Sequence, residues 1–151
     1  KSARFDIDKV NNLNINSRRD KFYLKDAGHI YGSLNFTLLE IDQLTQQLNV
    51  AAKYGDIEVK SFSDEVSSFY TEAENADLIL HFTDNKQYKI DATVDVKTEV
   101  LYSADIKNIT SSELDGDEEL IEVISTIDGN AGIIVPITMK SRGGSISLKL
   151  K

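Results

Sequence analysis

The chain of 151 residues has no cysteine, no tryptophan and a single proline, Pro136. The absence of cysteine excludes disulfide bonds and thiolate metal sites. The apolar stretches are short and interrupted, and this excludes a membrane span, which needs about 20 apolar residues in a row. At this length one domain with a substantial core is expected, so we predict a single domain over residues 1–151.

Positive charge is scarce as well, because the formal net charge is −8 and the pI is about 4.7. A nucleic-acid-binding protein needs a basic surface that neutralises phosphates. The sequence contains no basic stripe of this kind, so we exclude nucleic acid as a partner. The same negative charge disfavours binding to anionic membrane surfaces.

Motifs that would hold a cofactor or a catalytic metal are missing too. The two histidines, His29 and His81, lack the partner four residues away that a helical zinc motif requires, so we interpret them as surface or turn residues. Residues 141–145 are glycine-rich but precede an expected strand, whereas a phosphate loop precedes a helix. We therefore expect a bend there and no cofactor anywhere in the chain.

The chain does contain a repeated unit, in which one apolar-x-apolar triplet follows another after nine residues. Leu48 and Ile57 begin the triplets of one unit. Because side chains in a strand alternate between faces, each triplet points two apolar side chains inward. Residues 53–56 between these triplets, Lys-Tyr-Gly-Asp, are then a bend rather than a site. Further units begin at residues 13 and 22, 30 and 39, 69 and 78, 137 and 146, and, ten apart, at 90 and 100.

Equivalent positions of these units form columns with steps of 17, 17, 18, 21, 22 and 46 residues, and we interpret the last step as two periods with one turn skipped or distorted. A unit this short cannot hold a strand–helix–strand motif. We predict an all-β, right-handed parallel β-helix (β-solenoid) with short strands and roughly 17–22 residues per coil. A β-sandwich or meander, with strands about every 8–12 residues, stays open as the alternative. The columns are Phe5, Phe22, Leu39, Ile57, Leu78, Val100, Ile146; then Ile7, Leu24, Ile41, Val59, Leu80, Tyr102, Leu148; and a shorter third, Val10, Ala27, Leu44, Phe62.

The two ends and residues 103–136 depart from the repeat. Phe5 begins the second half of a unit with no first half before it, so we expect the parent protein to continue upstream of Lys1. The last strand carries Lys149 outward, a usual means of protecting an edge. Within 103–136 we predict an irregular acidic loop and an inserted hairpin, with strands at 120–124 and 133–135 and a tip at 127–132. The acidic residues 115–119 are either a solvated loop or a calcium site.

One outward column is a candidate binding surface, because aromatic rings stack on sugars and amides hydrogen-bond to hydroxyl groups. Ordinary cross-strand packing of the same residues is the alternative interpretation. A second outward column holds the carboxylates of Asp6, Glu40 and Glu58, of which Glu40 and Glu58 lie one coil apart; no basic partner is visible in it. Paired carboxylates would suit a carbohydrate-active enzyme. The candidate binding surface consists of Asn14, Tyr31, Asn49, Tyr70 and Asp91, followed by Thr138.

Three stretches, residues 13–23, 32–37 and 53–57, resemble a family of bacterial adhesins common in Bacteroidetes-like envelope proteomes, and residues 139–146 resemble its last coil. The resemblance implies a right-handed β-helical domain that is exported to the cell surface or periplasm of a Gram-negative bacterium. It implies no catalytic residues. We expect a non-catalytic adhesin or envelope scaffold that binds a glycan or protein, with self-association through the solenoid ends allowed. A carbohydrate-binding or carbohydrate-active protein, and a periplasmic interaction module of a larger signalling protein, are the alternatives.

Overall fold

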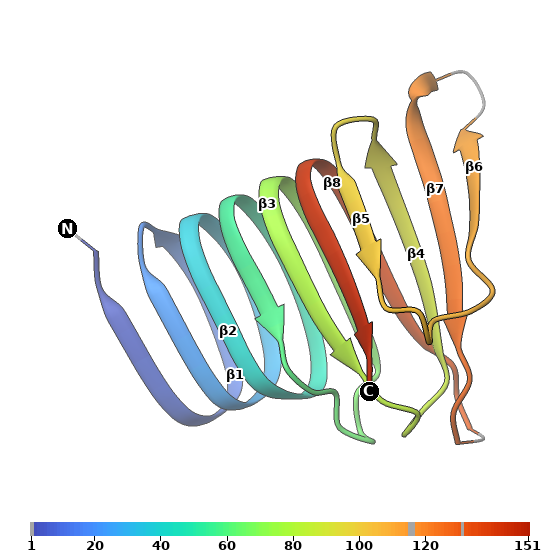
Figure 1. The fold of residues 1–151 in the computed structure, drawn as a ribbon. Helices are drawn as coiled ribbons and strands as arrows, with labels where there is room; N and C mark the ends of the chain where they lie inside the picture. Colours follow the sequence, from blue (N-terminus) through green and yellow to red (C-terminus); the bar gives the residue numbers. More distant parts are fainter. Residues whose placement is uncertain (1, 115–116, 131) are drawn as a thin grey trace.

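The structure is a computed structural model that describes residues 2–114, 117–130 and 132–151, with the side chains of residues 117 and 118 left out. It is all-β (Figure 1). The described residues contain no helix, and hence none long and apolar enough to cross a membrane. The strands are β1 (Arg4–Arg18), β2 (Lys21–Val59), β3 (Ser68–Phe82), β4 (Tyr88–Asp95), β5 (Glu99–Tyr102), β6 (Thr110–Leu114), β7 (Asp117–Ile127) and β8 (Val135–Leu150).

All eight strands belong to one sheet, in the order β1-β2-β3-β8-β4-β7-β6, with β5 paired to β8. Parallel pairing joins β1 to β2, β2 to β3 and β3 to β8. The registers confirm the predicted columns as far as β3, since Phe5 pairs with Phe22 and Ile57 pairs with Leu78. The third column is confirmed by the bridge between Leu44 and Phe62. From β1 to β3, each coil, meaning one turn of chain through two strand segments and their bends, therefore lies beside its predicted neighbour.

The strands are much longer than predicted, because the ladder continues around the bends. A straight strand with the 39 residues of β2 would measure about 130 Å, whereas β2 winds through more than one coil (Figure 1). Left-handed backbone at single residues turns the chain, with φ of 51° at Phe36 and 55° at Tyr54. The next residue, Gly55, is also required, because a Cβ there would lie 2.3 Å from the Thr37 carbonyl oxygen. Residues 53–56 thus form a bend, as predicted.

The place of β8 differs from the prediction. The column steps placed the coil of Val100 next to that of Leu78, with Ile146 last. In the structure β8 lies between them, so that Ile146 pairs with Leu78 on one side and with Val100 on the other. Figure 1 shows β8 in this position between β3 and the β4–β5 segment. No turn of the pattern is skipped, and Lys149 does not protect an edge, because β8 has neighbours on both sides.

The predicted hairpin is also wrong in its partners. β7 pairs antiparallel with β6 on one side and with β4 on the other, so residues 120–124 do not pair with residues 133–135. Residues 110–114, within the segment where an irregular acidic loop was expected, form β6 instead. Asp115 and Gly116, which belong to the predicted calcium site, lie outside the described residues. These antiparallel pairs make the sheet mixed, so it is not parallel throughout as the predicted β-helix requires.

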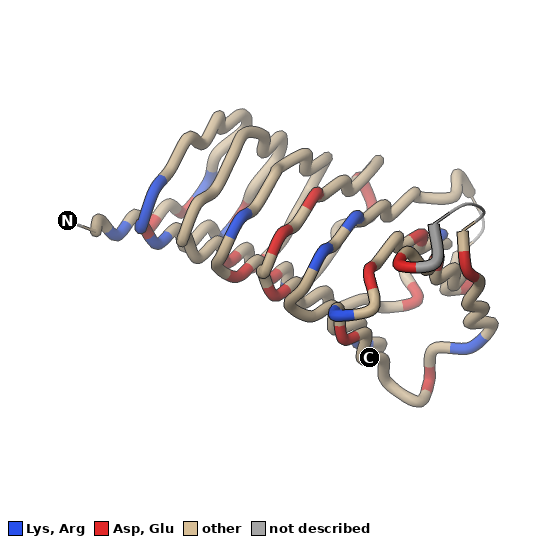
Figure 2. Tube along the Cα trace, turned by 90° about the horizontal axis from the view of Figure 1, so that it is seen from above, with Lys and Arg blue, Asp and Glu red and all other residues tan. Residues whose placement is uncertain are grey.

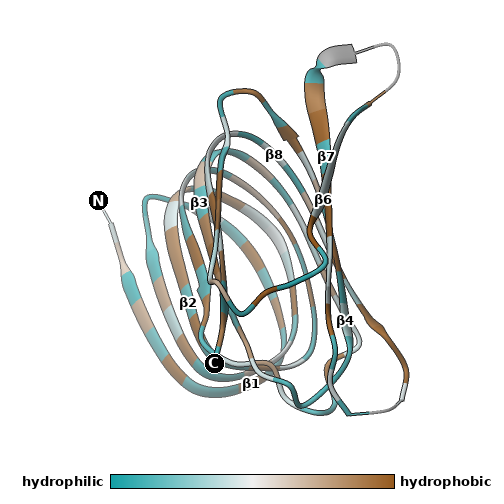
Figure 3. Cartoon of the chain, turned by 45° about the vertical axis from the view of Figure 1, so that its right-hand side comes forward, coloured by the Kyte–Doolittle hydropathy of each residue, from teal (hydrophilic) through white to brown (hydrophobic). Residues whose placement is uncertain are grey.

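The inward side chains of the columns form the core. Alternation along each coil is visible in Figure 3, where hydrophobic and hydrophilic residues follow one another. Leu39, Ile57 and Leu78 are completely buried, and each such side chain contributes about 1.5–3 kcal/mol through burial. The third column extends into an aromatic stack, in which the Phe62 and Phe82 rings lie 4.8 Å apart and 1° from parallel.

Candidate functional site: a groove across the outer face

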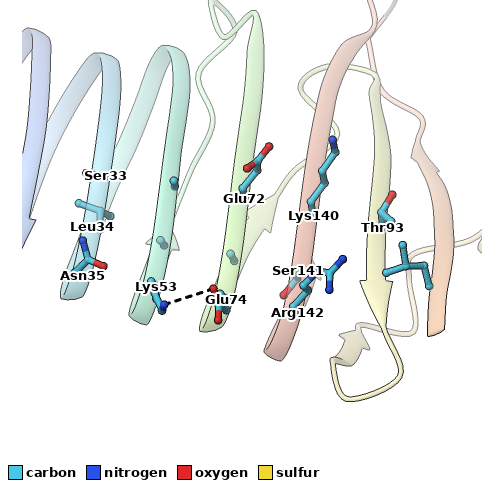
Figure 4. Close-up of a pocket in the computed structure, with 14 residues that line it drawn as sticks. Ser33, Leu34, Asn35, Lys53, Glu72, Glu74, Thr93, Lys140, Ser141 and Arg142 are labelled. Carbon is cyan, nitrogen blue, oxygen red and sulfur yellow. Dashed lines mark ion pairs between the residues drawn. The ribbon is translucent and has the colours of Figure 1, made fainter. Parts of the chain in front are cut away.

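A groove of about 400 Å³ crosses the outer face of the sheet (Figure 4). We call it the outer-face groove. Its lining residues lie on five successive strand segments, two from β2 and one each from β3, β8 and β4, and on β7, which contributes Leu120. Four strand spacings of about 4.8 Å give it a length of about 19 Å at right angles to the strands. The lining residues are Ser33, Leu34, Asn35, Ala51, Ala52, Lys53, Glu72, Ala73, Glu74, Thr93, Leu120, Lys140, Ser141 and Arg142.

Small residues explain why the face is hollowed here. Ala51 is the outward residue of β2 in register with Glu72 of β3, which in turn pairs with Lys140 of β8. Long side chains on Glu72 and Lys140 thus stand beside a position that ends at Cβ. On the inner side, Ala52 and Ala73 add little bulk beneath the sheet. The hollow therefore follows from local sequence on strands that are distant along the chain.

The charged residues that line the groove change sign from strand to strand, and Figure 2 shows basic and acidic residues on neighbouring coils. Lys53 is contributed by β2, Glu72 and Glu74 by β3, and Lys140 and Arg142 by β8. The Lys53 Nζ atom lies 3.9 Å from the Glu74 carboxylate, and both side chains are about half exposed, so solvent weakens this ion pair. The groove therefore offers both hydrogen-bond donors and acceptors along its whole length.

Tyr70 connects the groove to the predicted binding surface. Its hydroxyl donates a hydrogen bond of 2.6 Å to the Glu72 carboxylate. That bond, followed by partial burial, raises the pKa of Tyr70. The hydrogen bond holds the Glu72 carboxylate in place beside the phenol.

The predicted row of Asn and Tyr residues does exist on this face. Asn14 pairs with Tyr31, and Asn49 pairs with Tyr70. Because β8 is inserted, Thr138 stands between Tyr70 and Asp91, which reverses the expected order of the last two. The structure thus brings all five predicted residues into one row, although none of them lines the groove. From β2 to β4 the row lies two residues along each strand from the groove, whereas Asn14 is on β1, which contributes no lining residue. Whether the row binds a ligand stays a prediction.

A second aromatic border, which was not predicted from the sequence, lies on the other long side of the groove. Phe36 and Tyr54, one residue beyond the groove residues Asn35 and Lys53, have stacked rings with centroids 4.8 Å apart. Phe36 and Tyr54 are 50% and 39% exposed, and both lie at bends with left-handed backbone. The Arg19 guanidinium lies 5.7 Å from the Phe36 ring centroid. The only available signal was their spacing of 18 residues, one coil apart at outward bend positions.

The carboxylates of the second outward column have basic partners, contrary to prediction. Arg4 binds Asp6 at 2.8 Å, and its hydrogen bond lowers the pKa of that carboxyl. Lys60 pairs with Glu40, which raises the pKa of Lys60. His81 Nε2 lies 2.8 Å from the Glu58 carboxylate, so His81 is a partner of the column rather than an isolated turn residue. The neighbours Glu40 and Glu58 are thus each engaged with a different base.

The remaining candidate sites have a structural explanation. Residues 141–145 form a bend as predicted, with Gly143 and Gly144 at φ of 70° and 75°. A Cβ on Gly144 would lie 2.1 Å from the Ala76 carbonyl oxygen, so this glycine permits close approach of β3. Within residues 2–114, 117–130 and 132–151, no group of three or more His, Asp or Glu side chains is arranged to hold a metal ion.

Comparison with known proteins gives little further information. No family model matches the chain, and no curated protein matches it. One solved structure that it resembles is described as a putative cell adhesion protein from Clostridium sporogenes, with 11% identity and a TM-score of 0.49 over 99% of this chain and 91% of that one. At this level of similarity nothing about ligand or activity carries over.

Proposed function

We propose that this chain is a non-catalytic binding module that holds a linear glycan in the outer-face groove. The observation that supports this is the groove itself, open along about 19 Å and lined by hydroxyl, amide and charged side chains together with alanine and leucine. A long open groove accommodates a polymer better than a small compact molecule. Donors and acceptors in alternation suit the hydroxyl groups of successive sugar units.

Aromatic side chains on both sides of the groove support a carbohydrate ligand. Tyr31, with 46% of its surface exposed, and Tyr70 stand on one side, and the Phe36–Tyr54 stack stands on the other. Aromatic faces and edges pack against the apolar faces of sugar rings, while neighbouring polar groups fix their orientation. A protein ligand would not require this combination of polar side chains and aromatic borders.

The engagement of the carboxylates supports binding rather than hydrolysis. A glycosidase needs two carboxyl groups on opposite sides of one bond, one of them available as an acid. Glu40 and Glu58 each have their own base. In the groove, Glu74 pairs with Lys53 and Glu72 accepts the hydrogen bond from Tyr70. Within the groove, we assign Glu72 and Glu74 the role of hydrogen-bond acceptors for the ligand.

The wider role that we propose is that of an exported adhesin or envelope scaffold built on a right-handed parallel β-helix. The parallel pairing of β1, β2, β3 and β8 supports this architecture, and the resemblance of residues 13–23 and 139–146 to bacterial adhesins supports the location. A solenoid-like face of this kind presents an extended row of equivalent positions, which is suited to a repetitive ligand.

A glycan array with the purified chain tests the proposal. We expect binding to at least one linear glycan, and we expect Tyr31→Ala combined with Tyr70→Ala to weaken it by about tenfold, since each aromatic contact is worth about 0.5–1.5 kcal/mol. Glu72→Gln should weaken it as well. Tyr23→Ala is the matched control, because Tyr23 lies in the second outward column under Arg4. Equal binding by all these variants would refute the assignment, and turnover of the glycan would favour the enzyme alternative.

A further inference from the structure

The insertion of β8 separates two parts of the sheet that could pair directly. Phe69 of β3 and Ile90 of β4 are 21 residues apart, the same separation as between Leu48 and its partner Phe69. In the structure Ile137 of β8 stands between Phe69 and Ile90 and pairs with both. β8 therefore occupies a slot between two parts of the sheet that are consecutive in sequence.

The charge of β8 is complementary to that of the slot. Among its residues β8 has three basic side chains and no acidic one, in a chain with a net charge of −8. On one side, β3 has three acidic side chains and neither lysine nor arginine. On the other side, β4 and β5 together have three acidic side chains and one lysine. If β3 paired directly with β4, Glu74 would face Asp95, so the basic strand removes a repulsion between like charges.

Hydrogen bonds from both walls of the slot recognise β8 specifically. The Ser145 hydroxyl donates to Asp77 of β3 at 2.8 Å. The Gly143 N–H donates to Asp95 of β4 at 3.0 Å. The Leu150 N–H donates to the Ser103 hydroxyl, which follows β5, also at 3.0 Å. These contacts add to a β3–β8 register that keeps the same offset from Phe69 with Ile137 to Phe82 with Leu150.

β8 is connected to the remainder of the sheet only through the segment after β7. In this connection Ile133 and Ile134 are 85% and 54% exposed, and a Cβ added to Gly132 would meet no atom within 4 Å. Residues 132–134 are therefore little engaged with the body of the protein, whereas the start of the connection is anchored by the Asn130 N–H, which donates to the Asp84 carbonyl oxygen at 3.2 Å. Meanwhile β7 is held independently, by antiparallel pairing with β4 and β6.

From this arrangement we propose that β8 is an exchangeable strand, which one copy of the chain donates to the same slot of a second copy. The exchanged pair keeps every ladder, charge and side-chain contact of β8, because the slot of the second copy is identical. Only the path of the connection changes. The balance between the two forms then depends on protein concentration, as in domain swapping. Recognition is selective, since the slot is acidic and the strand is basic.

The absence of native cysteine allows a direct test with single-cysteine variants. Glu72 of β3 and Lys140 of β8 are register partners on the outer face. The Glu72→Cys chain and the Lys140→Cys chain are unfolded together, refolded at a series of protein concentrations and oxidised. The mixed disulfide between the two chains is then measured by non-reducing electrophoresis and mass spectrometry. The control pair, Asn16→Cys and Ser33→Cys, are register partners on β1 and β2 of the same face.

We expect the Glu72→Cys and Lys140→Cys mixture to give severalfold more interchain disulfide than the control mixture, with a yield that rises with protein concentration. Size-exclusion chromatography of the wild-type chain refolded in the same way should show a dimer. The double variant with both cysteines in one chain is the geometric control, and we expect it to form the intrachain disulfide between positions 72 and 140. If that double variant closes its intrachain disulfide while the mixture gives no more cross-link than the control, the exchange of β8 is refuted.

Discussion

A double-mutant cycle on three core residues tests the position of β8 most directly. Leu78, Ile146 and Val100 lie in one inward column in that order, on β3, β8 and β5. Which of these side chains are in contact is determined by truncating them singly and in pairs, with the substitutions Leu78→Ala, Ile146→Ala and Val100→Ala. The spacing of the sequence alone predicted a different order, with Val100 next to Leu78 and Ile146 at the end.

The structure sets the expected magnitudes. Leu78 and Ile146 are completely buried, so each truncation should lower the free energy of unfolding by about 2–5 kcal/mol. Val100 is only partly buried and loses fewer atoms, so its truncation should cost less. Side chains in contact have coupling energies of about 0.5–3 kcal/mol, and this is expected for Leu78 with Ile146 and for Ile146 with Val100. Leu78 and Val100 are two strand spacings apart, about 10 Å, so their effects should add.

Equilibrium unfolding in urea, followed by circular dichroism, measures all six variants. Where a pair leaves too little folded protein, Ile146→Val replaces the alanine, at a cost of about 0.5–1.5 kcal/mol. Additive effects of Leu78 and Ile146 together with a clear coupling between Leu78 and Val100 would refute the intercalated position of β8.

Three further predictions concern single residues and are measured by urea or thermal unfolding. The Thr71 hydroxyl is buried without a hydrogen-bond partner among the described residues, so Thr71→Val should stabilise the fold by about 1 kcal/mol, and a loss of stability would show that the hydroxyl is satisfied. Burial and the neighbouring Asp77 raise the pKa of Asp56, so the ionised carboxylate lowers the free energy of unfolding. This loss of stability is absent below the ordinary pKa of an aspartate, grows as the pH rises through the raised pKa, and persists at neutral pH. Asp56→Asn should therefore add about a few tenths of a kcal/mol at pH 7, after discounting for solvent, and nothing in strong acid; an equal gain at every pH would exclude the titration as its cause. Ile57→Glu should abolish folding, because Ile57 is completely buried and the new charge has no partner, whereas Glu at the outward Ile79 should be tolerated, and a folded Ile57→Glu chain would contradict the inward assignment of the column.

Much of the local structure could be predicted from the sequence. The alternation of apolar and polar residues determined which side chains point inward, because the side-chain direction in a strand has a period of two. The same spacing located the bends, so that Tyr54 and Gly55 were correctly interpreted as a turn. It also located the row of Asn14, Tyr31, Asn49 and Tyr70 on one face. Register follows wherever one face must be buried, since a slip by one residue would expose the core side chains.

The candidate site was only half predictable, because the groove depends on neighbours that are distant in sequence. Ala51, Glu72, Lys140 and Thr93 line it from three coils and an inserted strand. No local pattern distinguishes Ala51 from any other small outward residue until the long side chains beside it are known. The Phe36–Tyr54 stack was missed for a related reason, since bends tolerate many residue types and their spacing of 18 residues was not used.

Strand order was decided by the tertiary structure alone. Every coil presents nearly the same spacing of apolar residues, so hydrophobic burial favours stacking without specifying which coil lies next to which. Val100 and Ile146 fit equally well beside Leu78 on this criterion. The choice depends on terms that a column of apolar residues does not contain: the basic character of β8 between acidic strands, and the hydrogen bonds of Gly143 and Ser145 to the two walls of the slot. The sequence by itself thus determined the faces, the bends and the register, whereas charge and hydrogen bonding between distant segments determined the order of the sheet.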